Sequence, residues 1–325
     1  MHSSRGWFTA AAVVLVLVVS ACSYLPQSRG RGSRVAPASG ALLGTYTEPS
    51  RQDRAGQQTA VLGVESSMDR KLNLVHWFYP WGSTFPTWRE PWAQSGGRVN
   101  MVSWAPPPSV NDVNSGAYDH LIDLRARGMK AFGKPILLRW FAEMDSSTRR
   151  RQAVSPAAFI AAWRHIYNRF NAAGATNVEF VWCPDAWAFD TGAGAQWYPG
   201  DDYVQWTCAD GYNWAPKKPG SAWWSFERTF HNFYKWASSR SKPIIIGEVG
   251  AVEDPKHSGR KAQWIRDIAL TVRQWPRVKA LVWFDATAGT RSDPGLTYDW
   301  RVDSSPSAQA AWKEIGWWKI FHPYG

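Results

Sequence analysis

Two glutamates stand at the ends of apolar segments, where an acidic side chain needs a chemical reason to be. Glu143 ends the run 135–143 and Glu248 ends the run 242–248, and both runs have the composition of buried β-strands. Acids are depleted in strands and costly to bury without a partner. Parallel strands bring their carboxyl ends to one rim of a barrel, so this pair fits the cleavage of a glycosidic bond.

That cleavage requires two carboxyl groups in different protonation states. One donates a proton to the leaving oxygen, and in a retaining enzyme the other attacks the anomeric carbon from a carboxyl separation of about 5–5.5 Å. The donor keeps its proton near neutral pH only if burial or a nearby negative charge raises its pKa. The alternative for Glu143 and Glu248 is structural, because each can also cap a strand or pair with arginine.

Strand-like and helix-like segments alternate along the chain and must position the two glutamates. Several candidate strands are continuous apolar runs, as expected for parallel strands covered on both faces. The candidates are 59–65, 73–79, 100–104, 135–141, 178–183, 203–209, 243–247 and 278–284. Strands alternating with helices predict an α/β fold, a (β/α)8 TIM barrel, and a doubly wound open sheet is the alternative. In the barrel, Glu143 ends the fourth strand and Glu248 the seventh.

Four segments, in order, resemble the motifs of glycoside hydrolase family 26. Residues 139–145 (RWFAEMD) resemble that family's acid/base segment, and residues 246–250 (IGEVG) resemble its nucleophile segment. Residues 197–204, followed by residues 210–214, resemble its strand-six signature, and residues 182–185 (WCPD) match its strand-five end. The resemblance covers nearly all of 56–325. It implies a retaining hydrolase of β-linked mannan, glucan or xylan, with a polysaccharide or oligosaccharide as partner and with no cofactor or metal.

The resemblance also assigns roles to single residues. Glu143 would be the acid/base and Glu248 the nucleophile, with Tyr212 hydrogen-bonded to the nucleophile and Trp283 under the sugar at the cleavage point. Two positions depart from the family pattern, since Ala142 replaces its histidine and Asp145 its asparagine. Ala142 cannot donate a hydrogen bond beside the cleaved bond, so the resemblance does not identify the sugar. Asp145 would add a negative charge near Glu143 and raise its pKa, or else point into solvent.

The loss of that histidine leaves a second function open, a catalytically weak or inactive carbohydrate-binding lipoprotein on the same fold. Other candidates for substrate binding come from the strand ends. Arg139 shares the strand face of Glu143 by alternation, so it either orients a carboxylate or makes a structural salt bridge. Trp182 and Asp185 are candidates for the cleft, and Trp182 suits the core equally well. Four residues around the second strand are candidates for a sugar-binding wall: His76, Trp77, Tyr79 and Trp81. Asp285, after the eighth strand, is either a cleft residue or a loop cap.

The N-terminal region predicts export. Arg5 precedes the apolar run 7–19, which has the length of a signal-peptide core and is shorter than the roughly 20 residues of a membrane span. Residues 19–22 (VSAC) resemble a bacterial lipobox, so we predict a lipoprotein signal peptide over 1–21 and lipidation of Cys22; an ordinary signal peptide is the alternative. The expected location is the outer face of the bacterial cell membrane, contacted through the lipid alone.

Residues 22–55 are rich in Ser, Gly, Pro, Gln and Arg, and we predict a disordered tether there, followed by the catalytic domain over 56–325. The formal net charge is +11, but the basic residues are scattered, so we expect no nucleic-acid partner, and we expect a monomer. The 23 tryptophans suit both core packing and stacking on sugar rings. Cys183 and Cys208 end successive predicted strands, which leaves a disulfide and two buried thiols both open.

Overall fold

The computed structural model describes residues 1–2, 32–290 and 293–324. Cys22 and the predicted signal peptide, apart from its first two residues, lie outside these ranges, so lipidation and export stay predictions. Within the described ranges, no helix combines the length and the apolar character that crossing a membrane requires.

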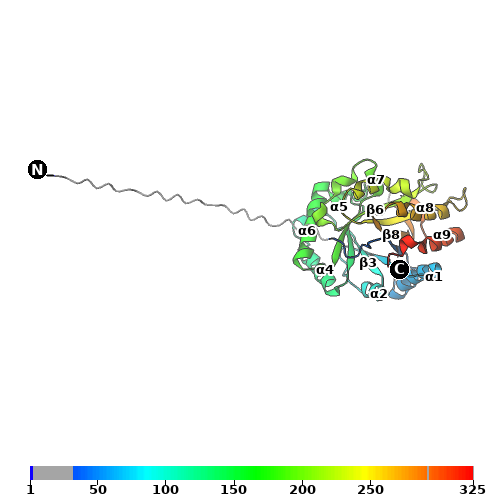
Figure 1. Cartoon of the computed structure of the whole chain (residues 1–325), viewed down its shortest axis with the longest axis horizontal. Coiled ribbons are helices and arrows are strands. Elements are labelled where there is room, and N and C mark those ends of the chain that lie inside the picture. The colour runs from blue at the N-terminus through cyan, green and yellow to red at the C-terminus, as the bar shows by residue number, and fades with distance from the viewer. Residues whose placement is uncertain (3–31, 291–292, 325) are drawn as a thin grey trace.

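Eight parallel strands close into a barrel in the order of the sequence (Figure 1). β1 pairs with β2 on one side and with β8 on the other, and this second pairing closes the ring. The predicted (β/α)8 barrel is therefore confirmed, and the open sheet is excluded. The strands are β1 Leu42–Thr47, β2 Leu74–Tyr79, β3 Val99–Trp104, β4 Ile136–Trp140, β5 Val178–Trp182, β6 Trp206–Asn213, β7 Ile244–Ala251 and β8 Val278–Asp285.

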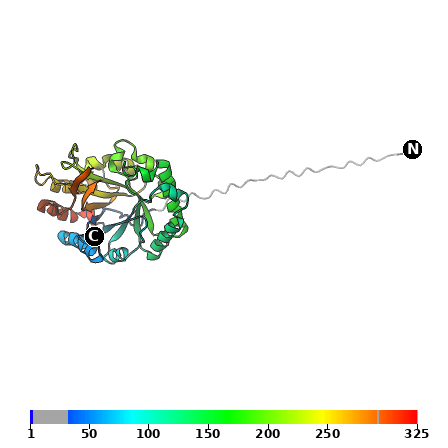
Figure 2. The ribbon, with the colours of Figure 1, turned by 180° about the vertical axis from the view of Figure 1, so that it is seen from behind.

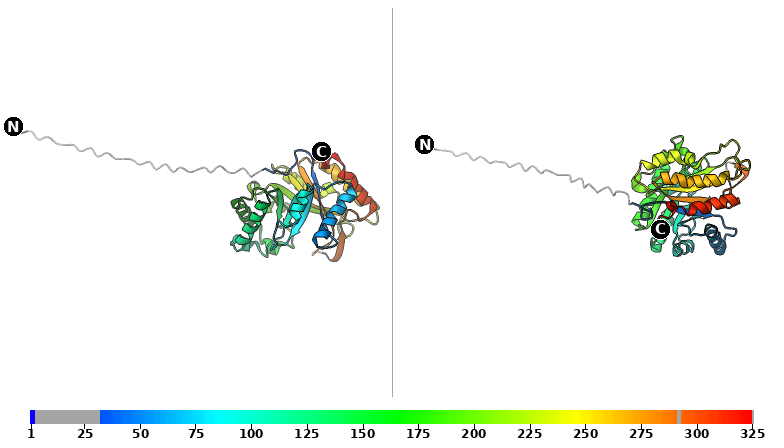
Figure 3. Two further views of the ribbon diagram at one scale, coloured as in Figure 1. Left: turned by 90° about the horizontal axis from the view of Figure 1, so that it is seen from below. Right: turned by 45° about the vertical axis from the view of Figure 1, so that its right-hand side comes forward.

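Helices surround the barrel on all sides (Figure 2). Several begin at the cap signals of the sequence, as at Ser155, whose hydroxyl accepts from Ala158 N while Pro156 takes the first helical position. The helices are α1 Arg54–Met68, α2 Arg89–Ser95, α3 Val110–Asn114, α4 Asp119–Phe132, α5 Arg150–Ala153, α6 Pro156–Ala172, α7 Phe226–Ser238, α8 Arg260–Gln274 and α9 Pro306–Gly316. Figure 3 shows α8 and α9 packed side by side. A hairpin, β9 Thr287–Thr290 and β10 Asp293–Asp299, follows β8.

The first barrel strand does not lie where the sequence predicted it. The segment 59–65 belongs to helix α1, whose buried residues include Val61, Val64 and Met68 at helical spacing. The prediction failed because seven residues of an amphipathic helix contain enough apolar positions to imitate a strand. The true first strand, β1, lies inside the predicted tether 22–55.

The predicted domain boundary at residue 56 is therefore wrong as well. Ser33 Oγ and Arg34 N both donate to the carboxylate of Glu179 on β5, at 2.6 Å each. Val35 is buried with the apolar side chains inside the barrel. The folded domain thus includes residues 33–55. Composition misled the prediction because this stretch is polar apart from the short β1.

Apolar side chains form two layers that alternate along each strand. An inner layer fills the barrel, and its strand residues include Leu42, Leu74, Met101, Leu137, Val181, Trp206 and Ile245. A larger outer layer packs the strands against the helices. Much of the tryptophan surplus is in this outer layer, where the fully buried rings include Trp104, Trp140, Trp163, Trp182, Trp264, Trp283 and Trp312. Core packing therefore accounts for much of the unusual composition.

Candidate active site

Glu143 and Glu248 meet at the carboxyl-terminal rim of the barrel, with a third acid beside them. Glu143 follows β4, Glu248 lies in β7, and Asp210 lies in β6. One carboxylate oxygen from each of the three lies within 4.8 Å of the others. Such a spacing suits direct attack by one carboxylate on a sugar carbon, because inverting enzymes need about 6.5–9.5 Å to admit a water molecule.

The backbone around Glu143 adopts unusual angles. Phe141 and Glu143 have φ values of 48° and 54°, in the left-handed region that residues other than glycine rarely occupy. Two backbone hydrogen bonds hold them, from Phe141 N to Trp104 O at 3.0 Å and from Glu143 N to Cys183 O at 2.8 Å. Such conformations cost about 1–3 kcal/mol each and persist where neighbouring structure enforces them, often at active sites.

The backbone around Glu248 is irregular too. The pairing of β6 with β7 shifts register between Ala209 and Asp210, and that of β7 with β8 shifts between Ile246 and Val249. Bulges of this kind bend a strand and re-aim its side chains, and they are frequent beside active sites. Here the shifts direct both Asp210 and Glu248 into the same space above the inner apolar layer.

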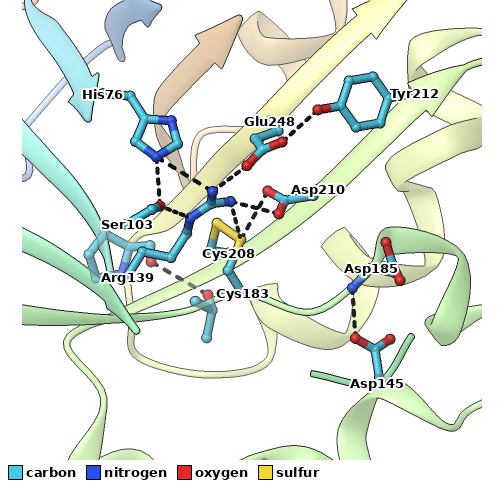
Figure 4. The surroundings of a disulfide bond; sticks show 12 residues. His76, Ser103, Arg139, Asp145, Cys183, Asp185, Cys208, Asp210, Tyr212 and Glu248 are labelled. Atoms are coloured by element: carbon cyan, nitrogen blue, oxygen red, sulfur yellow. Dashed lines mark hydrogen bonds and ion pairs between the residues drawn. A yellow bond between two sulfur atoms is a disulfide. The ribbon is translucent and has the colours of Figure 1, made fainter. Parts of the chain in front are cut away.

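Arg139 organises the carboxylates from below (Figure 4). Its guanidinium is buried and donates from Nη1 to Asp210 at 2.6 Å, from Nη2 to Glu248, and from Nε to Ser103 Oγ at 2.5 Å. His76 Nε2 lies 2.6 Å from the same Ser103 hydroxyl. Arg139 therefore makes a salt bridge and orients carboxylates at once, so the two roles expected for it are not alternatives. Such buried pairs need these extra hydrogen bonds to offset desolvation.

The other oxygen of Glu248 is held by Tyr212. The Tyr212 hydroxyl donates to Glu248 Oε2 at 2.6 Å, which is the contact that the family resemblance implied. With Arg139 on one oxygen and Tyr212 on the other, the Glu248 carboxylate is fixed by donors on both sides.

Glu143 is in the opposite situation. Burial first, and then the negative charge of Glu248, raise the pKa of Glu143 to about 7, although Arg139 and Arg149 act in the opposite direction. Glu143 thus holds its proton to a much higher pH than an ordinary glutamate does, while its neighbour Glu248 is surrounded by donors. This separation of roles is what acid catalysis beside a nucleophile requires.

Three further acids have raised pKa values, each chiefly through burial. Asp145 reaches about 6, and the pKa values of Asp185 and Asp210 lie well above the ordinary range. Asp145 Oδ1 accepts from Asp185 N at 3.1 Å, so Asp145 is buried beside the site and does not point into solvent. Its negative charge is one of the causes that raise the pKa of Glu143.

A cation site was also considered at the three clustered acids. Glu143, Asp210 and Glu248 together offer carboxylate oxygens close enough to share an ion. Arg139 already donates to Asp210 and Glu248, so a fixed guanidinium supplies the positive charge at this position. The residues present therefore suit acid and nucleophile chemistry better than metal ligation.

A cleft of about 850 Å³ opens at Glu143 and Asp210. Glu143, Asp185, Asp210 and Tyr212 lie at one part of it, and the lining continues along Trp187, Trp214, Trp224 and Trp300. Trp187 and Trp224 expose 53% and 37% of their surface. Exposed flat rings beside a polar floor suit the C–H faces of sugars. Asp185 is therefore a cleft residue, as the sequence predicted.

The predicted substrate contact of Trp283 is wrong, and for Trp182 the core alternative is confirmed, because both side chains point away from the barrel axis. Trp283 is fully buried between Trp264 and Trp312 and donates from Nε1 to Trp300 O at 2.7 Å. Trp182 is fully buried against Tyr198 and Trp236. Alternation along a strand sends the neighbouring residue to the other face. Next to Trp283, it is Phe284 that lines the cleft.

The sugar-binding wall predicted near the second strand is mostly wrong for the same reason. Trp77 donates to Asn100, and Tyr79 donates to Glu90, both on the outer side of β2. Trp81 stacks on Trp104 at 4.3 Å and does not line the cleft. His76 alone faces inward, where it contacts Ser103. Asp285 accepts from Val302 N at 2.8 Å, which makes it a loop cap.

Sequence reasoning missed Asp210, Ser103 and Phe284. Asp210 could have been found by the rule that identified the glutamates, because it directly follows the predicted strand 203–209. Ser103 and Phe284 carry no comparable signal, since serine and phenylalanine are ordinary in strands. The predicted alternative for the cysteines is resolved, because Cys183 and Cys208 form a disulfide.

The fold and the site together define a (β/α)8 barrel with paired carboxylates at its rim, and comparisons with known proteins find relatives that can be set beside it. The chain is 34% identical over 321 residues to "Endoglucanase H" of Acetivibrio thermocellus, a match that covers 93% of this chain. The chain spans about a third of that relative, 32% of its length. No family model matches the chain.

Solved structures show the same fold. A ruminal endo-β-1,4-mannanase of glycoside hydrolase family 26 superimposes with a TM-score of 0.64 at 12% identity, covering 89% of this chain and 68% of that one. A family 26 β-mannanase from Bacteroides ovatus superimposes with a TM-score of 0.61 at 15% identity, covering 87% and 90% of the two chains. The barrel fold of this chain is thus shared with both structures.

Proposed function

We propose that this protein is a retaining glycoside hydrolase of the family 26 type that cleaves β-linked polysaccharide. The observation that carries the proposal is the geometry of the two glutamates, with oxygens within 4.8 Å and opposite electrostatic surroundings. The 34% identity to a protein named as an endoglucanase supports the reaction class. The barrel fold, shared with two family 26 mannanases, provides the rim on which such a pair of glutamates can act.

In the first half of the proposed reaction, Glu248 attacks the anomeric carbon. The bond between that carbon and the leaving oxygen breaks, and Glu143 transfers its proton to this oxygen. Arg139 and Tyr212 hold Glu248 in line for the attack. A covalent glycosyl–enzyme ester results, and Glu143 is left ionised.

In the second half, the ester at Glu248 no longer carries a negative charge. One of the causes that raise the pKa of Glu143 is thereby removed, so Glu143 now acts as a base. It takes a proton from water, whose oxygen attacks the anomeric carbon and releases Glu248. The sugar keeps its configuration after two inversions, and both glutamates return to their starting protonation states.

The proposed substrates are β-linked polysaccharides of the mannan, glucan or xylan type. The exposed tryptophans along the cleft support binding of several sugar units on a chain. Ala142 provides no hydrogen bond beside the cleaved bond, so the preferred sugar is best determined on a panel of polysaccharides.

The test of this function is Glu248→Gln on that panel. Gln keeps the shape of the side chain but cannot form the ester, so turnover should fall by about ten-thousandfold or more. Thermal unfolding should stay close to that of the unaltered protein. Equal release of reducing sugars by the two proteins would refute the assignment, and binding without release by the unaltered protein would favour the carbohydrate-binding alternative.

We further propose that the enzyme is exported as a lipoprotein, is anchored through Cys22 to the outer face of the cell membrane, and acts as a monomer. Support comes from the lipobox-like VSAC segment at 19–22 and its position directly after the apolar run 7–19. Metabolic labelling with a fatty-acid analogue should mark the protein and fail to mark Cys22→Ala. Equal labelling of both would overturn the anchor.

A further inference from the structure

The disulfide between Cys183 and Cys208 lies beside Asp210 and close to Arg139 (Figure 4). Cys183 follows β5, Cys208 lies in β6, and both side chains are fully buried inside the barrel. The ladder between β5 and β6 has only two paired positions, against six between β2 and β3. The bridge therefore joins the strands covalently where backbone pairing is sparse.

Cys183 contacts the elements that place the acid. Its carbonyl accepts the backbone N–H of Glu143 at 2.8 Å, which helps to hold the left-handed conformation there. Its Sγ lies 3.2 Å from Asp210 Oδ1 and 3.9 Å from Arg139 Nη1. One half of the bridge thus contacts the acid's backbone and the ion pair that orients the nucleophile.

Both sulfurs also contact the backbone that carries the nucleophile. A Cβ atom added to Gly247 would lie 2.3 Å from Cys208 Sγ and 2.9 Å from Cys183 Sγ. These distances are far below contact, so the residue before Glu248 packs its backbone against the bridge and has no room for a side chain. The disulfide therefore supports this part of β7 through direct packing.

We propose that the Cys183–Cys208 disulfide is a positioning element of the active site, which sets the separation between the carboxyl groups of Glu143 and Glu248. The inference rests on the proposed function, because it assigns a purpose to that separation. Small errors in such placement are costly, since displacement by about 1 Å can lower a rate by about a hundredfold.

The bridge also affects the charge of Asp210. An oxidised sulfur has no hydrogen to donate, so its contact with Asp210 Oδ1 is a hydrogen bond only when Asp210 itself is protonated. A hydroxyl at position 183 would instead donate to Asp210 and stabilise the ionised form. The added negative charge would lie within 4.8 Å of both Glu143 and Glu248. Serine and alanine in place of the cysteines should therefore behave differently.

Two double variants test the proposal, Cys183→Ala with Cys208→Ala and Cys183→Ser with Cys208→Ser. Met129→Ala on α4 is the control, because Met129 is fully buried in the outer layer and its loss lowers stability without contacting the site. We expect kcat to fall about tenfold or more in both double variants with little change in KM, and to hold in the control at a comparable loss of Tm. Double variants that lose Tm but keep kcat within about twofold would overturn the proposal.

The pH profile and the Glu248→Gln variant complete the experiment. The limb of kcat/KM at high pH should lie about half a pH unit higher in the serine variant than in the alanine variant, and identical limbs would contradict the role of the bridge at Asp210. Unaltered enzyme that turns over no faster than Glu248→Gln would refute the proposed function. Active unaltered enzyme with fully active double variants would refute only the positioning role.

Discussion

The barrel interior has two levels that differ in chemistry and share the same strands. The lower level holds Leu74, Met101 and Leu137. Two residues further along the same strands and on the same face stand His76, Ser103 and Arg139, which contact one another above it. Barrels of this kind separate stability at one end from activity at the other. Two residues along a strand therefore separate the apolar level, which stabilises the barrel, from the polar level, which belongs to the active site.

The largest loss of activity is expected from a change at Arg139, in the upper level. Arg139→Lys keeps the positive charge but loses the fork that reaches Asp210, Glu248 and Ser103 together. We expect kcat to fall about a hundredfold or more, with cooperative unfolding retained. Steady-state kinetics with thermal unfolding measures both, and a variant with unchanged kcat would show that the guanidinium does not orient the nucleophile.

Leu137, two residues earlier on β4, should respond in the opposite way. Leu137→Ala leaves a cavity in the inner layer, so the free energy of unfolding should fall by about 2–5 kcal/mol. Activity per folded molecule should change much less than for Arg139→Lys. Denaturant unfolding and active-site titration separate the two quantities. A large loss of kcat in the folded fraction would break the division between the levels.

A smaller effect is expected at the end of β8, where neighbours face opposite layers. Phe284 lines the cleft, so Phe284→Ala should raise KM several-fold, in line with about 1 kcal/mol of lost stacking. Trp283→Phe should instead lower Tm without raising KM, because Trp283 packs between the strands and helices. The test is to measure KM on one polysaccharide and Tm for both variants. A raised KM for Trp283→Phe together with an unchanged KM for Phe284→Ala would contradict the assigned faces.

The smallest effect concerns pH. Glu143 must be protonated to donate, and its pKa is raised to about 7, so kcat/KM should decline as the pH rises through that value. Asp145→Asn removes one of the negative charges that raise this pKa. The decline should therefore begin at a lower pH, by less than about one unit. A pH profile that moves upward, or does not move, would show that Asp145 does not raise the pKa of Glu143.

Sequence patterns predicted the barrel and its acids because both follow local rules. Buried parallel strands are continuous apolar runs, and Glu143 and Glu248 interrupt them at their ends. β1 was not predicted, because its six residues lie in a polar stretch and show little periodicity. The apolar residues of α1 instead predicted a strand over 59–65. Local pattern alone does not decide between these readings, whereas pairing of β1 with β8 does.

The facing of individual aromatic residues was harder to predict. Trp283 and Phe284 differ by one position, and only the register of β8 in the closed barrel tells which of them faces the cleft. The disulfide was hard to predict for a similar reason, since the spacing of Cys183 and Cys208 in the chain allows a bridge without requiring it. Both depend on how neighbouring strands are aligned in the closed barrel, which the local sequence pattern does not specify.

The central claim is that Glu248 forms a bond to the sugar, and trapping that bond tests it most directly. A 2-deoxy-2-fluoro β-glycoside of the preferred sugar, with a good leaving group, should slow the second half of the reaction more than the first. Peptide mass mapping of the inactivated enzyme should then find one glycosyl group on Glu248. A label on Glu143 or Asp210, or full turnover of the active enzyme with no trapped ester, would contradict the account.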